Sequence, residues 1–225
     1  MQRLAQNGNG VAAYIDSMDE ARRVLGEEAN GALMTIANDV KVQVEFNPAR
    51  VAEYRLIGYE TRMLRREDFN NDRVDAGEIG AGHSVTAIYE ITPVGGPTFN
   101  EPLRYQGGPS AALSSAGELA FLRIRYKLPG QNNSRLIERA ITDADLVRDV
   151  ASAPEAARWA TAVAGYGQLL RGDPYLGGAY GWEDVITLAQ SARGRDEHGW
   201  RREFIQLAQR ASRAPPMRER DNDAG

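Results

Sequence analysis

The spacing of the apolar residues changes once along this chain, and that change constrains its fold more than any other feature. Between residues 40 and 141, apolar side chains recur at every second position within short segments, which is typical of strands that bury one face. From Ser152 onward the spacing becomes three to four residues, which is typical of helices. The sequence therefore predicts an α+β protein in which a sheet region precedes a helical region.

The strand pattern is clearest at residues 40–46 and 122–128, where apolar and polar side chains alternate without a break. Weaker strands are expected at 52–59, 85–91 and 135–141. Short segments rich in Pro, Gly and Asn separate them, and such segments form turns. Five or six antiparallel strands with short connections favour a β-sandwich over residues 34–147.

Three helices are predicted in a C-terminal unit at residues 148–213, with a disordered tail at 214–225. Ser152 and Glu155 have the spacing of a capping box, which predicts the start of the first helix. One face of that helix carries Trp159, Val163, Tyr166 and Leu170. The second and third helices are expected at Trp182–Arg193 and Trp200–Ala211. A second capping box, Ser17 with Glu20, predicts a short helix that begins at Met18.

Composition excludes several classes of function. The net charge of -4 provides no basic surface for a nucleic acid. The absence of cysteine excludes disulfides and thiolate metal sites. No apolar run approaches the roughly 20 residues that a membrane-spanning helix needs. Neither the Gly-x-Ser-x-Gly nor the His-Glu-x-x-His motif occurs, so we predict no catalytic residues and no enzyme activity.

An acidic loop at residues 67–78 is the candidate metal site. Asp68, Asn70 and Asp72 place oxygen atoms at alternate positions, and Asp75 could add another, as in calcium-binding loops. The pattern departs from an EF-hand, because Arg73 stands where that loop needs glycine. The alternative is a polar loop whose Asn and Asp side chains cap their own backbone.

An aromatic loop at residues 174–182, with the sequence PYLGGAYGW, is the candidate partner-binding site. Tyr175, Tyr180 and Trp182 lie among glycines, and exposed aromatic rings in such loops can contact a partner. The alternative is that these rings pack between helices. Asp143 and Asp145 could form an acid–base pair, but a capping or turn role between sandwich and helices is favoured.

Several strings carry a resemblance to a known family. The segment LAQNGNGVAAYIDSMDEARRVL resembles the last turn, strand and helix of a von Willebrand factor type A domain. Six others resemble the region after that domain in a group of bacterial proteins: DVKVQVEFNPA, YRLIGYE, EDFNNDRVDAGEIGAGHSVTAIYEI, LRIRYKLPG, AVAGYGQLLRG and REFIQLAQ. That region is a domain of unknown function, and the resemblance covers about residues 4–211.

The resemblance implies that residues 1–33 are the C-terminal end of a truncated A domain, placed before the sandwich. It also implies a binding or scaffolding role, without catalysis, in the bacterial cell envelope or periplasm. The implied partners are the protein's own A domain and an unidentified envelope protein. The metal-dependent adhesion site of an A domain needs Asp-x-Ser-x-Ser, which is absent here, so this chain is not expected to hold that site. The alternative function is a cation-binding or hydrolytic domain that uses the acidic loop.

Overall fold

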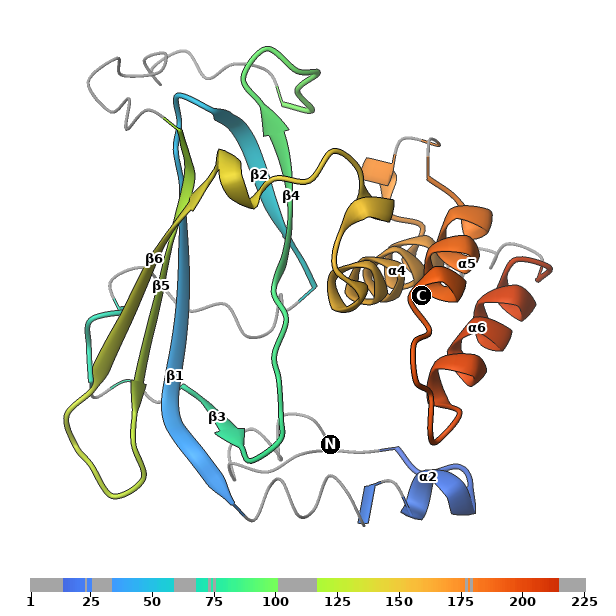
Figure 1. The fold of residues 1–225 in the computed structure, drawn as a ribbon, viewed down its shortest axis with the longest axis horizontal. Coiled ribbons are helices and arrows are strands. Elements are labelled where there is room, and N and C mark those ends of the chain that lie inside the picture. The colour runs from blue at the N-terminus through green and yellow to red at the C-terminus, as the bar shows by residue number, and fades with distance from the viewer. Residues whose placement is uncertain are drawn as a thin grey trace, which may run out of the picture.

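The computed structural model describes residues 14–22, 24–25, 34–58, 68–72, 74, 76–100, 117–176, 178 and 180–214. These residues form three layers (Figure 1): a four-stranded sheet, a two-stranded sheet and a group of helices. Most of the segment predicted to end an A domain, the acidic-loop residue Asp75 and the predicted tail beyond Ala214 lie outside the described residues. The α+β class, with antiparallel sheets followed by helices, is confirmed.

The four-stranded sheet has the order β3-β1-β5-β6, and all its pairs are antiparallel. Its strands are β1 (Thr35–Phe46), β3 (Gly77–Gly80), β5 (Glu118–Lys127) and β6 (Arg135–Thr142). The two strongest sequence patterns, at 40–46 and 122–128, thus lie in the two central strands. Strand β3 was not predicted, because two of its four residues are glycines and leave no pattern.

The second sheet pairs β2 (Val51–Ile57) with β4 (Ile88–Pro93) and forms the middle layer. Its Tyr54 and Tyr89 pack against Phe46 of β1. Their ring centroids lie 4.6 and 5.3 Å, respectively, from the centroid of the Phe46 ring. Because successive residues of a strand point to opposite faces, Arg55 and Glu90 face the helices. The two sheets therefore contact each other at Phe46, and the sandwich itself stays a prediction.

The helical layer consists of α4 (Glu155–Arg171), α5 (Trp182–Ser191) and α6 (Trp200–Ala211). Its core is formed by Ala162, Leu188, Ala189 and Ile205, with Trp159 and Phe204 packed against them. Arg201 at the start of α6 pairs with Glu155 at the start of α4 at 2.8 Å and stacks on the Trp159 ring at 4.8 Å. This arginine joins the first and third helices.

The two predicted capping boxes have different outcomes. The short helix α2 (Met18–Arg22) begins where it was predicted, and the Ser17 hydroxyl accepts the Glu20 N–H at 3.1 Å. The second box is wrong, because the N-cap of α4 is Pro154. Ser152 instead ends a 3-10 turn, where the Asp149 carboxylate accepts its N–H and hydroxyl. None of the described helices has both the length and the apolar character needed to cross a membrane.

Candidate functional site

The acidic loop is bound to the polar face of the four-stranded sheet. Its side chain Phe69 is only 2% exposed, and the Arg123 guanidinium lies over the ring at 5.8 Å. Lys41 and Arg125 are register partners on β1 and β5, so their side chains leave the sheet on this same face. The part of this face on β1 and β5, which looks solvated in the sequence, is therefore covered by a loop.

Both lysines of the chain hold this loop. Lys41 is 3% exposed, and its ammonium donates to the backbone carbonyls of Asp68, at 3.1 Å, and Asn71. Lys127 donates to the Asp39 carboxylate at 2.6 Å and to the Asp72 carbonyl at 2.8 Å. An ammonium is a compact charge with three donors, which suits convergent carbonyl oxygens better than a planar guanidinium does.

Arg125 hydrogen-bonds to side-chain oxygens of the loop. Its guanidinium donates to Asn70 Oδ1 at 3.2 Å, to Asp72 Oδ1 at 3.2 Å and to the Ser134 hydroxyl at 2.6 Å. The pKa of Asp72 is held below its usual value, first by a hydrogen bond with Ser134 and then by Arg125 and Lys127. Two of the four predicted calcium ligands, Asn70 and Asp72, therefore face an arginine.

The calcium prediction thus receives no support from the part of the loop that the structure describes. Within that part, no group of three His, Asp or Glu side chains is placed to hold a metal ion. Asp68 contributes its carbonyl to Lys41, and Asp75 is outside the described residues. The calcium site stays a prediction. In the described geometry, the Lys41 ammonium lies at the Asp68 carbonyl, and the Arg125 guanidinium lies at the side-chain oxygens of Asn70 and Asp72.

In the aromatic loop, Tyr175 lies at the boundary between the sheets and the helices. The residue is 43% exposed, and the Arg55 guanidinium lies over its ring at 4.6 Å. Phe99, which is 55% exposed, meets the ring edge-on at 5.3 Å. This pair of rings is accessible, as a partner-binding role requires.

Tyr180 and Trp182 are packed within the helical layer. Tyr180 lies so close to Gly165 of α4 that a Cβ atom there would be 2.5 Å from the ring. Trp182 meets Tyr166 of α4 edge-on at 5.7 Å. Their positions match the alternative of packing between helices, whereas that of Tyr175 leaves the partner-binding prediction open.

A cavity of about 420 Å³ opens beside this loop. It is lined by Leu169, Gly172, Asp173, Pro174, Leu176, Gly178 and Tyr180. The Tyr180 hydroxyl is buried and hydrogen-bonds to no residue that the structure describes, and burial raises its pKa. Asp173 reaches the cavity from the junction with the sheets.

An ion-pair network at that junction was not found in the sequence. Arg55 of β2 donates to Glu90 of β4 at 2.7 Å and to Asp173, just after α4, at 2.9 Å. The Asp173 side chain is 7% exposed. Burial raises the pKa of Asp173, but hydrogen bonds from Arg55, the Tyr175 N–H and Gln168 outweigh burial and lower it. No local motif marks a pair separated by more than a hundred residues, so only the fold reveals it.

Asp143 and Asp145 have the turn role that was favoured for them. They lie in a 3-10 turn, Asp143–Asp145, directly after β6. Asp145 accepts the Thr142 N–H at 2.9 Å, whereas Asp143 pairs with Arg50 at 2.7 Å. The two carboxylates are therefore held by separate partners, and the capping interpretation is confirmed.

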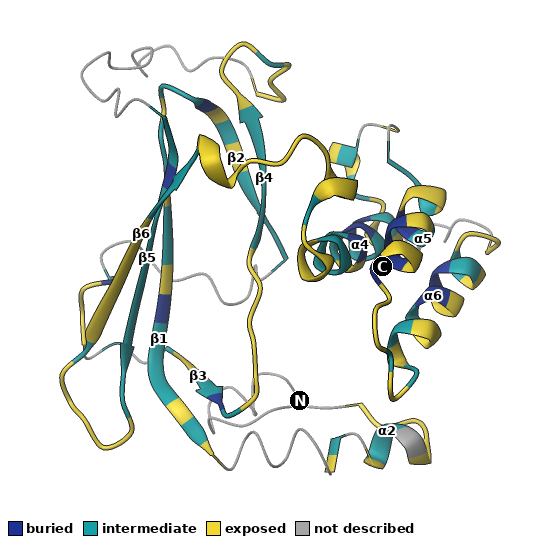
Figure 2. Ribbon diagram, in the orientation of Figure 1, coloured by how far each residue is buried: buried dark blue, intermediate teal, exposed yellow. Residues whose placement is uncertain are grey.

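The opposite face of the four-stranded sheet carries an apolar row: Val42, Ile124 and Ile137. The three residues are register partners across β1, β5 and β6. Val42 is 47% exposed and Ile137 50% exposed, and Figure 2 shows the exposed part of β6. The alternation of apolar and polar residues predicts that such a face is buried. The two-stranded sheet contacts this face at Phe46. Both ends of the apolar row nevertheless stay accessible.

The comparisons with known proteins give one consistent relationship. Residues 31–214 match a family described as "Uncharacterized protein YfbK, C-terminal". The chain is 45% identical over 212 residues to the uncharacterized protein YfbK of Escherichia coli (strain K12). The alignment covers 94% of this chain and 36% of that protein, so the chain spans about a third of its relative's length. No solved structure matches the chain.

Proposed function

This chain belongs to the family of the YfbK C-terminal region, and from that premise we propose that it is a non-catalytic protein-interaction or scaffolding module of a longer protein. The proposal includes a place beside a von Willebrand factor type A domain in the bacterial envelope, as the strings DVKVQVEFNPA and EDFNNDRVDAGEIGAGHSVTAIYEI suggest by their resemblance. Its first partner is that A domain.

The apolar row is the observation that carries this proposal. A sheet with one apolar face and one polar face ordinarily buries the first and exposes the second. Here the acidic loop covers the polar face at β1 and β5, with Lys41 buried, whereas Val42 and Ile137 on the apolar face are half exposed. Accessible apolar residues side by side on a flat surface are typical of a protein-binding surface.

The remainder of the longer protein is the occupant that we propose for this face. The chain corresponds to 36% of the length of its relative, so a large part of that protein is available to cover the apolar row. A contact within one polypeptide needs little intrinsic affinity, because the linkage keeps the effective concentration high. The row therefore serves to fix the module against its neighbouring domain.

The test uses this chain and the preceding part of the longer protein as two separate polypeptides. We expect them to bind in calorimetry, and we expect Val42→Asp with Ile137→Asp to weaken binding by about a hundredfold, because each change places a charge in an apolar contact. The matched control is Leu136→Asp. Leu136 is 44% exposed beside Ile137 but points to the other face of β6, so binding should be unchanged.

Two results would count against the proposal. In the first, the two polypeptides do not bind, and the backbone amides of β1, β5 and β6 exchange hydrogen at the same rate in this chain and in the longer protein. The other is an equal loss of binding in the Leu136→Asp variant and in the double variant. A turnover activity that depends on Asp68 or Asp72 would instead favour the alternative cation-binding or hydrolytic function.

The calcium alternative has its own test. A bound ion stabilises the folded state by mass action, so it raises the melting temperature. Because Arg125 already holds Asn70 and Asp72, we expect the melting temperature to be the same in excess calcium and in chelator. A rise in calcium that disappears in the Asp68→Asn variant would overturn this expectation and support a cation site.

A further inference from the structure

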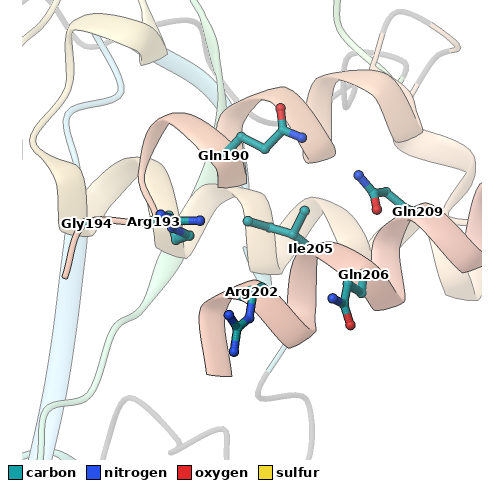
Figure 3. Close-up of a pocket in the computed structure, with 7 residues that line it drawn as sticks. All are labelled: Gln190, Arg193, Gly194, Arg202, Ile205, Gln206 and Gln209. Carbon is teal, nitrogen blue, oxygen red and sulfur yellow. The ribbon is translucent and has the colours of Figure 1, made fainter. Parts of the chain in front are cut away.

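A groove between α5 and α6 lies on a different part of the molecule from the apolar row. Its volume is about 410 Å³, within the range of roughly 300–1,000 Å³ that is usual for small-ligand sites. It is lined by Gln190, Arg193, Gly194, Arg202, Ile205, Gln206 and Gln209. Figure 3 shows Ile205 at the centre of this group, with Gln190 from α5 on one side and Arg202 and Gln206 from α6 on the other.

The polar side chains of the groove are available to a ligand. None of the three glutamine amides hydrogen-bonds to another residue in the part of the chain that the structure describes. Each amide offers both an N–H donor and a C=O acceptor, which is the pair of groups that a peptide bond can satisfy. A phosphate offers mainly acceptor oxygens, so it would leave most of the amide C=O groups without a donor. Ile205, 8% exposed, provides an apolar floor.

The charge of the groove favours an anionic ligand. Arg193 and Arg202 lie near the carboxylate of Asp196. Burial raises the pKa of Asp196, but the N–H groups of Arg202 and Arg201 and the charges of Arg193 and Arg202 lower it below its usual value. That carboxylate offsets one of the two positive charges. The Glu155 carboxylate lies against Gly194 at the edge of the groove, where its charge is balanced by Arg201.

We propose that the α5–α6 groove binds a short acidic peptide segment, with the glutamine amides on its backbone and Arg193 and Arg202 on its carboxylates. A guanidinium holds a carboxylate through two parallel hydrogen bonds, which gives both affinity and orientation. Such a groove adds a second binding surface to the module, on the helix α6 that lies farthest from the sheets in Figure 1. The proposal does not depend on the apolar row, so each surface can fail its test separately.

The test uses the 225-residue chain and a fluorescein-labelled peptide, Gly-Glu-Ala-Glu-Gly. We expect saturable binding in fluorescence polarisation, and shifts of the side-chain NH₂ signals of Gln190, Gln206 and Gln209 in NMR spectra. Arg193→Gln and Arg202→Gln should each weaken binding about tenfold through loss of a charge-assisted contact. Gln206→Leu should weaken it as well, because it removes a donor and an acceptor without changing charge.

Arg210→Gln is the matched control, since Arg210 is an exposed arginine of α6 that does not line the groove. It should bind like the unchanged chain, and a peptide with Gln in place of Glu should bind at least tenfold more weakly. Three results would overturn the proposal. The first is no change in polarisation at protein concentrations up to millimolar, and the second is an equal loss of peptide affinity in Arg193→Gln and Arg210→Gln. The third is displacement of the peptide by inorganic phosphate together with full peptide binding by Gln206→Leu. The last result would identify a simple anion site.

Discussion

Lys41 has an unusual position for a lysine, because it is almost fully buried on a sheet face and bound to backbone oxygens. Its ammonium donates to two carbonyls of the acidic loop, and it reaches them without a carboxylate partner that the structure describes. Burial of a charge is costly unless its hydrogen bonds are made, so this contact holds only while the loop stays in place. The position of the loop and the burial of Lys41 are therefore interdependent.

We predict that Lys41→Met destabilises the fold by about 1–3 kcal/mol, because it leaves the carbonyls of Asp68 and Asn71 without their donor. Urea unfolding followed by circular dichroism measures this loss. The control is Arg148→Met, a change at an exposed residue between the sheets and the helices, which should alter stability by less than about 0.5 kcal/mol. A Lys41→Met variant as stable as the control would show that the loop does not depend on the ammonium.

Two glycines of α4 provide a second prediction at the scale of single residues. A Cβ at Gly165 would meet the Tyr180 ring at 2.5 Å, whereas a Cβ at Gly167 would meet nothing within 4 Å. We expect Gly165→Ala to destabilise by about 1–3 kcal/mol through overpacking. Gly167→Ala should stabilise by about 0.5–1 kcal/mol, because alanine favours a helix over glycine. Thermal unfolding of both variants compares them directly, and a gain from both would mean that Tyr180 moves aside freely.

At the scale of elements, the sequence predicts the existence of strands and helices better than it predicts their faces. Strands β1 and β5 and helices α5 and α6 were found because their apolar spacing is regular. The face of α4 was only partly right: Trp159 and Tyr166 pack on Phe204, but Val163 is 42% and Leu170 40% exposed. Two of the three buried positions, Ala162 and Gly165, are instead small residues, because α5 and the aromatic loop approach α4 closely there, and the third is Gln168.

For the candidate sites, too, the sequence predicts that a cluster exists but not what it contacts, and the reason is physical. The acidic loop and the aromatic loop are visible in the sequence as clusters of one residue type, but their partners come from distant strands and helices. Arg125 and Lys127 read as a solvated strand face, and nothing local indicates that the loop covers them. Whether a polar cluster binds a ligand or the protein itself is decided by tertiary contacts, which a single sequence does not display.

The junction between β2 and the end of α4 gives a prediction for acid stability. The pKa of Asp173 is lowered in the folded state, so its contribution is present above the unfolded pKa of about 3.9 and is lost as pH falls through the folded value. We expect Asp173→Asn to be less stable than the unchanged chain at neutral pH. This difference should shrink on acidification below about pH 4.

Urea unfolding from about pH 7 to about pH 3 measures this difference. The comparison variant is Asp143→Asn, whose carboxylate is 57% exposed in its pair with Arg50 and should contribute less. If the Asp173→Asn variant lost stability with acid as steeply as the unchanged chain, other carboxylates would be responsible and the junction would not control acid stability.

At the scale of the whole molecule, the sheets and the helices meet at β2, at β4 and at the segment after α4, among the residues that the structure describes. The contacts between them include the Arg55–Asp173 ion pair and the Phe99–Tyr175 ring contact, whereas the helices have a core of their own. Small interfaces between units allow them to separate more readily than they unfold. A charged residue buried at such an interface is costly once its partner is removed.

The three tryptophans, Trp159, Trp182 and Trp200, all lie in the helical unit, so their fluorescence follows that unit alone. Arg55→Leu leaves Asp173 buried without its arginine, so we predict that it weakens the contact between sheets and helices by about 1–3 kcal/mol. The thermal unfolding transition seen by fluorescence should then occur at a lower temperature than the transition of the sheets seen by circular dichroism. In the unchanged chain the two transitions should coincide. Arg139→Leu removes an exposed pair within the sheet region and should leave them coincident. Coincident transitions in Arg55→Leu as well would show that the helices and sheets are joined by more than this ion pair.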